Sequence, residues 1–189
     1  MNKISFTVAE ETEKLLTGTS KLFGNPDVWD GFEWPHFTEN GEEYDLNFVC
    51  QINCNEIAEY NKKGLLPKIG MLYFFYDMDM LPPESINAKA SRVLYYDGDP
   101  ASLHQMLRTD QHGNDLSLPE VKMQFGSDDQ PHALLDAPPL DDWQPLLTIH
   151  AFETKRLSTI FSNKDALCFY DKEKNRINND FSKVFVRLI

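Results

Sequence analysis

The chain has 189 residues, 41% of them hydrophobic, and a formal net charge of −12 at pH 7. This length and composition are sufficient for one substantial hydrophobic core. So acidic a chain is expected to bind neither nucleic acid nor an anionic membrane, and its field favours a basic partner, although the same charge also promotes solubility. The longest apolar run, residues 71–76, is far shorter than the roughly 20 residues that span a bilayer.

The first residues, MNKISFTVAEETEK, contain no apolar signal-peptide core, so we expect a cytoplasmic protein. Thr7 and Glu10 have the spacing of a capping box, which predicts a short helix to about Leu16. The chain contains an odd number of cysteines, all within or at the ends of apolar stretches: Cys50, Cys54 and Cys168. We therefore expect buried thiols in a reducing compartment.

Residues 19–46 are rich in glycine and proline and are expected to form a loop that is held down by its aromatic side chains. The rings should then point inward and the acidic side chains outward. Residues 1–45 contain 10 acidic against 3 basic residues. The proposed acidic patch for a partner comprises Glu39, Glu42, Glu43 and Asp45, and the same stretch also holds Asp27, Asp30 and Glu33.

Residues 47–76 read as a strand, a short helix, a Pro-Gly turn and a second strand. Phe48, Cys50 and Ile52 alternate with more polar neighbours, which is the period of a half-buried strand. Asn55 is placed as the N-cap of the helix that follows. The aromatic run 71–76 is expected to be a central strand.

A weaker copy of this unit lies near the C-terminus. LLTIHAFE (146–153) aligns with VCQINCNE (49–56), so that Ile149 matches Ile52, and ALCFY (166–170) aligns with MLYFF (71–75). SKVFV (182–186) aligns with SRVLY (91–95). Three matches in the same order indicate an internal duplication.

Between the copies, Asp99 and Pro100 form an N-cap and first-turn pair that predicts a short helix through residues 101–108. A strand is expected at residues 120–125 and a brief helical piece at 132–135. The fold class predicted is α+β, with two pseudo-symmetric, mainly antiparallel units of three or more strands in one domain, 1–189. Half-module one covers about 20–108, a connector about 109–131, and half-module two about 132–189.

Eight short motifs occur in the order SKLFGNP, WP, FVCQIN, LLPKIGMLYFFY, RVLYY, HALLDAP, DALCFY and DFSKV, from about Ser20 to Ile189. This order resembles the YwqG-like family of bacterial domains. That family usually carries a second glycine where Asn25 stands and a Gly-Tyr-Pro-like turn at 136–138. The resemblance implies a duplicated, antiparallel α+β architecture without an assigned activity, and a role beside bacterial toxin or secretion systems.

No motif for catalysis stands out. The chain has no Gly-x-Ser-x-Gly elbow and no phosphate-binding loop, and its histidines lack metal-ligand spacing. Acidic pairs after two expected strands, Asp77 with Asp79 and Asp97 with Asp99, could suit a hard cation. If these strands are antiparallel neighbours, however, the pairs lie at opposite edges of the sheet, and turn and capping roles explain all four residues. We therefore expect no metal and no cofactor.

Two functions remain open. The first is a non-enzymatic module that binds a basic protein partner, immunity-like and associated with a toxin or secretion system, through the acidic patch. The alternative is a small-ligand-binding or enzymatic protein that uses a groove between the two repeats. The candidate groove residues are Trp34, Gln51, Asn53, Arg92, Thr148 and His150. The sequence does not indicate an oligomeric state.

Overall fold

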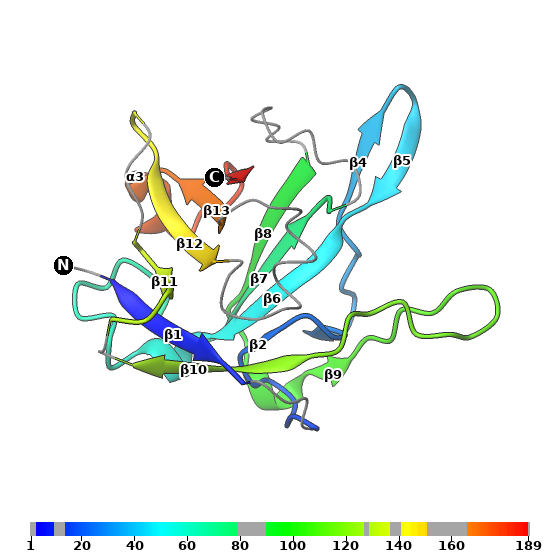
Figure 1. Ribbon diagram of the computed structural model, residues 1–189, viewed down its shortest axis with the longest axis horizontal. Helices are drawn as coiled ribbons and strands as arrows, with labels where there is room; N and C mark the ends of the chain where they lie inside the picture. Colours follow the sequence, from blue (N-terminus) through cyan, green and yellow to red (C-terminus); the bar gives the residue numbers. More distant parts are fainter. Residues whose placement is uncertain are drawn as a thin grey trace.

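The computed structural model describes residues 3–9, 14–78, 90–126, 129–136, 141–150 and 166–188. These residues form a mostly β structure (Figure 1). The strands are β1 (Ile4–Val8), β2 (Lys21–Leu22), β3 (Asp27–Val28), β4 (His36–Glu39), β5 (Glu42–Asp45), β6 (Asn47–Asn53), β7 (Met71–Tyr76), β8 (Ser91–Tyr96), β9 (His104–Gln105), β10 (Val121–Gly126), β11 (His132–Leu134), β12 (Gln144–His150), β13 (Ala166–Asp171) and β14 (Phe185–Leu188). The described helices are α1 (Cys54–Ile57), the 3-10 helix η2 (Pro100–Ser102) and α3 (Glu173–Arg176).

One antiparallel sheet of 10 strands dominates the molecule, in the order β14-β13-β12-β11-β1-β10-β2-β6-β7-β8. Its two outer strands, β8 and β14, curl toward each other. Ser91 Oγ on β8 donates to the carbonyl of Val184 at 3.3 Å, and the rings of Tyr95 and Phe181 lie 6.3 Å apart. The sheet is therefore nearly closed and barrel-like, which leaves little exposed strand edge.

The predicted α+β class with two units is wrong. The helices are single turns, and both repeated strand groups belong to the same sheet. The expected connector is not peripheral, because its strand β10 pairs with β1 on one side and β2 on the other. Backbone hydrogen bonding across β11, β1, β10 and β2 thus merges the two halves into one architecture.

The strand register nevertheless repeats. Ile52 pairs with Leu72 in the first group, and Ile149 pairs with Leu167 in the second. Each pairing is interrupted by a β-bulge at the corresponding place, between 48 and 50 in β6 and between 145 and 147 in β12. The predicted alignment of the first two strands is therefore confirmed in register, although it does not define separate units.

The alignment of the third strand is wrong by two residues. Phe74 pairs with Val93, and the corresponding Phe169 pairs with Val186. The offset is thus 186 − 93 = 93, instead of the 182 − 91 = 91 inferred from the matching serines. An error of two residues preserves which side chains face the core, because side chains alternate along a strand.

The closed sheet buries one apolar cluster inside, which includes Cys50, Ile52, Phe74, Ile149 and Phe169. The outer face of β6 and β7 carries a second cluster. Its buried members include Tyr73, Phe75, Phe48 and Phe37, and Trp29, Phe32 and Trp34 are among the side chains that pack against it. The aromatic loop is therefore packed down as predicted. A third cluster covers the outer face of β12 and β13, with buried Cys168, Tyr170 and Phe185.

Several local predictions change in the structure. Thr7 lies in β1 opposite Gln124, so it does not cap a helix; the rest of that capping box falls outside the described residues. Asn53, and not Asn55, caps α1.

Two further helices predicted from local signals are absent at those places. Asp99 accepts from the N–H of Ala101 as an N-cap, but only one 3-10 turn follows before β9. Residues 132–134 form strand β11, because pairing with β1 and β12 outweighs their local preference.

Two arms, from parts of the chain that lie far apart in sequence, project from the same side of the molecule (Figure 1). The first is the β4–β5 hairpin, whose turn residues Asn40 and Gly41 have φ of 52° and 86°, as a type I′ turn requires. The second, here called the β9–β10 arm, comprises residues 106–120 and folds back on itself through the bridge between Thr109 and Asp115. Among the described residues, no helix has the length and hydrophobicity to cross a membrane.

Candidate functional site

A pocket of about 300 Å³ opens at the base of the two arms. The β9–β10 arm, the start of β6 and the loop before β4 border it. Its walls mix large apolar side chains with a few polar ones. The lining residues are Gly24, Asn25, Trp34, Asn47, Phe48, Met78, Arg108, Leu116, Ser117 and Leu118.

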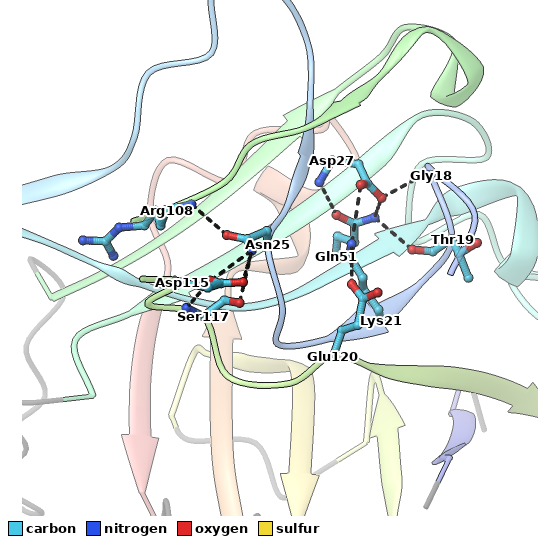
Figure 2. Close-up of polar contacts among 10 residues, drawn as sticks. All are labelled: Gly18, Thr19, Lys21, Asn25, Asp27, Gln51, Arg108, Asp115, Ser117 and Glu120. Atoms are coloured by element: carbon cyan, nitrogen blue, oxygen red, sulfur yellow. Dashed lines mark hydrogen bonds and ion pairs between the residues drawn. The ribbon is translucent and has the colours of Figure 1, made fainter. Parts of the chain in front are cut away.

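Asn25 fastens the β9–β10 arm to the body of the protein (Figure 2). Its side-chain carbonyl accepts from the N–H of Arg108 at 2.9 Å, and its Nδ2 donates to Asp115 at 3.1 Å and Ser117 Oγ at 3.1 Å. The amide therefore bonds to both sides of the arm at once. With 5% of its surface exposed, Asn25 acts as a structural clamp that fixes one wall of the pocket.

Hydrogen bonds also hold Asp115 in its charged form. The N–H of Ser117, and to a smaller extent its hydroxyl and the amide of Asn25, lower the pKa of Asp115. Gly24 completes the attachment: its N–H donates to the carbonyl of Leu118 at 2.8 Å. Its φ is +76°, and a Cβ there would meet Glu120 Cβ at 2.5 Å, so the close approach of the arm requires glycine.

Behind this wall lies a buried polar network (Figure 2). The carboxylate of Asp27 accepts from Gln51 Nε2 at 2.6 Å, from the N–H of Gly18 at 2.9 Å and from Lys21 Nζ at 3.4 Å. Lys21 Nζ also reaches Glu120 at 3.0 Å. Because the polar groups of Asp27 and Gln51 are occupied by protein partners, the network is structural support and offers no free group to a ligand.

Arg108 provides a positive charge at the pocket. Its guanidinium carbon lies 4.6 Å from the ring centroid of Trp34, and its Nη2 donates to Asp45 at 3.0 Å. Trp34 is itself oriented by the hydrogen bond from its Nε1 to the carbonyl of Leu46 at 2.8 Å. The cation–π contact and the ion pair together hold the guanidinium over the pocket while 30% of the side chain stays exposed.

Two kinds of donor remain available there. Arg108 carries five N–H donors, and the described structure uses those of one terminal nitrogen only. Asn47 accepts from the N–H of Met78 at 2.9 Å, and its Nδ2 has no partner among the described residues. Both residues line the pocket, whose apolar walls are Phe48, Met78 and Leu116. The arrangement suits a ligand with an apolar body and a hydrogen-bond-accepting group.

The structure separates the predicted groove residues. Trp34 lines the pocket, and Gln51 lies in the network behind it. Asn53 is engaged in capping α1 and in a bond from its Nδ2 to Gly18. Thr148 donates to the carbonyl of Asp136, far around the sheet on β12.

His150, also on β12, donates its N–H to the ring of His132, and Arg92 on β8 donates to the carbonyl of Ser91. The polar faces of β6 and β12 are outer faces of a rolled sheet, with four strands between them. They therefore do not enclose a common groove, and the pocket lies at the arms instead of between the repeats.

The predicted acidic patch is mostly exposed. Glu42, Glu43 and Asp45 on β5 are exposed, and Glu39 on β4 is half-buried. Asp27 does not belong to it, since it is 2% exposed and faces the buried network. The exposed patch thus consists of the acidic residues of the β4–β5 hairpin, together with Asp30 and Glu33 in the loop before it.

The pocket residues Asn25, Asn47, Arg108 and Leu116 were not among the predicted site residues. One available signal was the Asn-Gly pair at 40–41 between two short polar runs, which indicates a hairpin and hence an arm. No local pattern reports that Arg108 meets Trp34, because the contact joins parts of the chain that lie far apart.

Chemistry by thiols is disfavoured. Burial raises the pKa of Cys50 and Cys168, and it raises that of Cys54 to about 12. All three thiols are free and buried, so they remain protonated and inaccessible near neutral pH. Within the described ranges, no three His, Cys, Asp or Glu side chains converge on a possible metal position.

Comparison with known proteins identifies the family of the chain. No curated protein matches the chain. A family model described as a domain of unknown function, DUF1963, matches residues 20–145. This span contains both arms, the side chains of the buried network and every pocket-lining residue. The chain therefore belongs to the DUF1963 family of domains of unknown function.

Proposed function

We propose that this protein is a non-enzymatic binding module whose pocket at the base of the two arms takes a ligand with an apolar body and a hydrogen-bond acceptor. The observation that carries the proposal is the placement of Arg108 over Trp34 at the pocket, together with Asn47 among the same lining residues, whose Nδ2 has no partner in the described part of the chain. Fixed donors beside apolar walls give both affinity and orientation.

Rigid construction of the site supports a binding role. Asn25 holds the arm and the Asp27 network lies behind it, so little ordering is required when a ligand enters. The protonated, buried thiols and the structural engagement of the buried carboxylates support a module without catalysis.

The test uses small apolar carboxylates, phenylacetate and hexanoate, together with their amides. Binding is followed in amide and side-chain NMR spectra through the Nδ2 signals of Asn47 and the Nε signal of Arg108. We expect at least one compound to shift both sets of signals in a saturable way. If none of the four compounds shifts them, the proposal is wrong.

Two exposed leucines of the same arm provide a matched pair of variants. Leu116 lines the pocket and is 55% exposed, whereas Leu107 is 65% exposed and does not line it. Leu116→Lys should weaken binding and Leu107→Lys should not, and both variants should fold because each leucine is already largely solvated. Equal effects of the two substitutions would place the ligand elsewhere.

A second candidate function is recognition of a basic protein partner, immunity-like and associated with a toxin or secretion system. The specific observation in its favour is the projecting β4–β5 hairpin, in which all four residues of β5 are exposed. Reversing Glu39, Glu42 and Glu43 to Lys should change stability by only about 0–1 kcal/mol per charge. Capture of such a partner should fall, mainly through a slower association rate; unchanged capture would exclude this surface.

We also propose that the chain belongs to the YwqG-like bacterial domains, because the eight motifs occur in the order typical of them. We further propose that the protein is located in the cytoplasm. The acidic composition and the three free cysteines support the location. Fractionation of the source cells, with the protein followed by antibody, tests it: recovery outside the cytoplasmic fraction would contradict the assignment.

A further inference from the structure

The acidic β4–β5 hairpin and the pocket are joined at one point, the ion pair between Asp45 and Arg108. Asp45 ends β5, and Asn47 and Phe48, which line the pocket, follow directly in β6. The exposed surface of the hairpin therefore leads into the pocket without an intervening element. A ligand long enough to leave the pocket along β5 would pass over this surface.

The two faces of the hairpin differ. One face carries Phe37 and Tyr44, whose rings stack at 5.4 Å, and Phe37 is buried in the outer aromatic cluster. Because side chains alternate along a strand, Glu43 and Asp45 share the opposite face. Their side chains are 73% and 55% exposed, and Glu43 approaches the ring of His36 at 3.8 Å. This face presents two carboxylates about 7 Å apart. The one nearer the pocket, Asp45, is paired with the pocket-lining Arg108.

A peptide segment provides the chemistry that both regions require. Its backbone carbonyls are acceptors for the free donors of Arg108 and Asn47. One apolar side chain fills the space between Phe48, Met78 and Leu116. Lysine or arginine side chains at alternate positions, also about 7 Å apart in an extended chain, match the spacing of the two carboxylates.

We infer that the ligand of this pocket is an extended peptide segment in which one apolar side chain enters the pocket and basic side chains at alternate positions lie over Asp45 and Glu43. This inference rests on the proposed function and specifies its ligand. Charge complementarity selects the occupant: a net charge of −12 and the exposed carboxylates of the hairpin disfavour an acidic segment and attract a basic one. The ion pair with Asp45 offsets the charge of Arg108, so the guanidinium does not repel that segment.

The experiment measures fluorescence anisotropy of labelled synthetic peptides with the full chain. The first peptide has a central leucine, with lysines two and four residues away on each side and serines between them. In the second, glutamates replace the lysines, and in the third, serine replaces the leucine. We expect saturable binding of the first peptide only, and weaker binding as the salt concentration rises.

Variants then locate the peptide. Glu43→Lys should weaken binding of the first peptide about 3- to 5-fold, the effect of one exposed charge pair. Glu42→Lys is the matched control, because it makes the same charge change on the opposite face of the same strand. It should leave the affinity within about 2-fold of the unmodified protein. Leu116→Lys should reduce the affinity more than Leu107→Lys.

The outcomes separate this inference from the function on which it rests. If the small carboxylates or amides bind at Asn47 and Arg108 but the lysine peptide does not, the inference is wrong and the binding module stands. Equal binding of the lysine and glutamate peptides, or equal effects of the Glu42 and Glu43 reversals, also overturns it. If neither the peptides nor the small compounds bind, both proposals fail.

Discussion

Phe74 and Phe169 meet edge to face inside the sheet, with ring centroids 5.1 Å apart and an interplanar angle of 80°. They occupy corresponding places in the repeated strand pairs, since Phe74 lies opposite Cys50 and Phe169 opposite Leu147. Neither side chain is exposed to solvent. The repeated register thus brings its own equivalent residues into contact at the centre of the core.

Truncation of this pair tests the shared core. Phe74→Ala and Phe169→Ala should each lower the free energy of unfolding by about 3–5 kcal/mol, because each removes a fully buried ring and leaves a cavity. Urea unfolding measures the loss. A loss below about 1 kcal/mol for either variant would show that the ring does not pack as described.

The double variant Phe74→Ala/Phe169→Ala measures the contact itself. We expect the two losses to be non-additive by about 0.5–1.5 kcal/mol, as found for aromatic pairs in contact. Phe185→Ala, in the cluster on the outer face of β12 and β13, serves as a control partner for Phe74, because the two rings belong to different clusters. Additive losses for Phe74 and Phe169 would contradict a direct contact.

Asp27→Asn tests the buried network behind the pocket. The carboxylate accepts from Gly18, Lys21 and Gln51, and an amide would place an N–H group against one of these donors. We expect a loss of stability of about 1–3 kcal/mol in urea unfolding, the cost of an unmatched buried polar group. Asp30→Asn, at an exposed position nearby, should change stability by less than about 0.5 kcal/mol.

Asn25→Ala should release the β9–β10 arm. The backbone N–H of Leu116, which donates to the carbonyl of Arg108, and that of Ser117, which donates to Asp115, should exchange with deuterium faster when the clamp is lost. Asn178→Ala removes an exposed amide from another part of the chain and should leave these rates unchanged. Unaltered exchange in Asn25→Ala would show that other contacts hold the arm.

We expect His132 to make the stability of the fold sensitive to acid. Burial, and to a smaller extent the charge of His150, lower the pKa of His132 from 6.5 to about 4. Its Nδ1 accepts from the N–H of His150 at 3.0 Å, so the neutral ring is the form that fits. As the pH falls, the unfolded chain binds this proton first. The stabilisation is therefore complete above about pH 6.5 and is lost progressively between about 6.5 and 4.

The loss attributable to His132 approaches about 3 kcal/mol at the acid end of this range. Urea unfolding at pH 7 and pH 5 measures it. In His132→Asn, whose side-chain carbonyl can still accept from the backbone, the difference in stability between the two pH values should shrink. His112→Asn, at an exposed position, should retain the full difference. An unchanged pH dependence in His132→Asn would exclude this residue as its source.

The fold was partly predictable from local patterns. The alternation in β6, the aromatic run of β7 and their copies in β12 and β13 were recognised because side chains on successive residues face opposite sides of a strand. Helices were over-predicted. At residues 101–108 and 132–135 a capping signal or short apolar run was taken for a helix, whereas pairing with β3, β1 and β12 drew these segments into strands.

By itself, the sequence determined where the repeated strands lie, that their apolar side chains are buried and that the chain is acidic, because these properties depend on nearest neighbours and composition. Only the tertiary structure decided that the strands form one nearly closed sheet and that the pocket lies at the arms. Asn25 and Asp115 are 90 residues apart in sequence, and Trp34 and Arg108 also lie far apart in the chain. These residues meet in space because β10 pairs with β2 and β9 pairs with β3. Such long-range pairing depends on the whole sheet, and no local spacing in the chain encodes it.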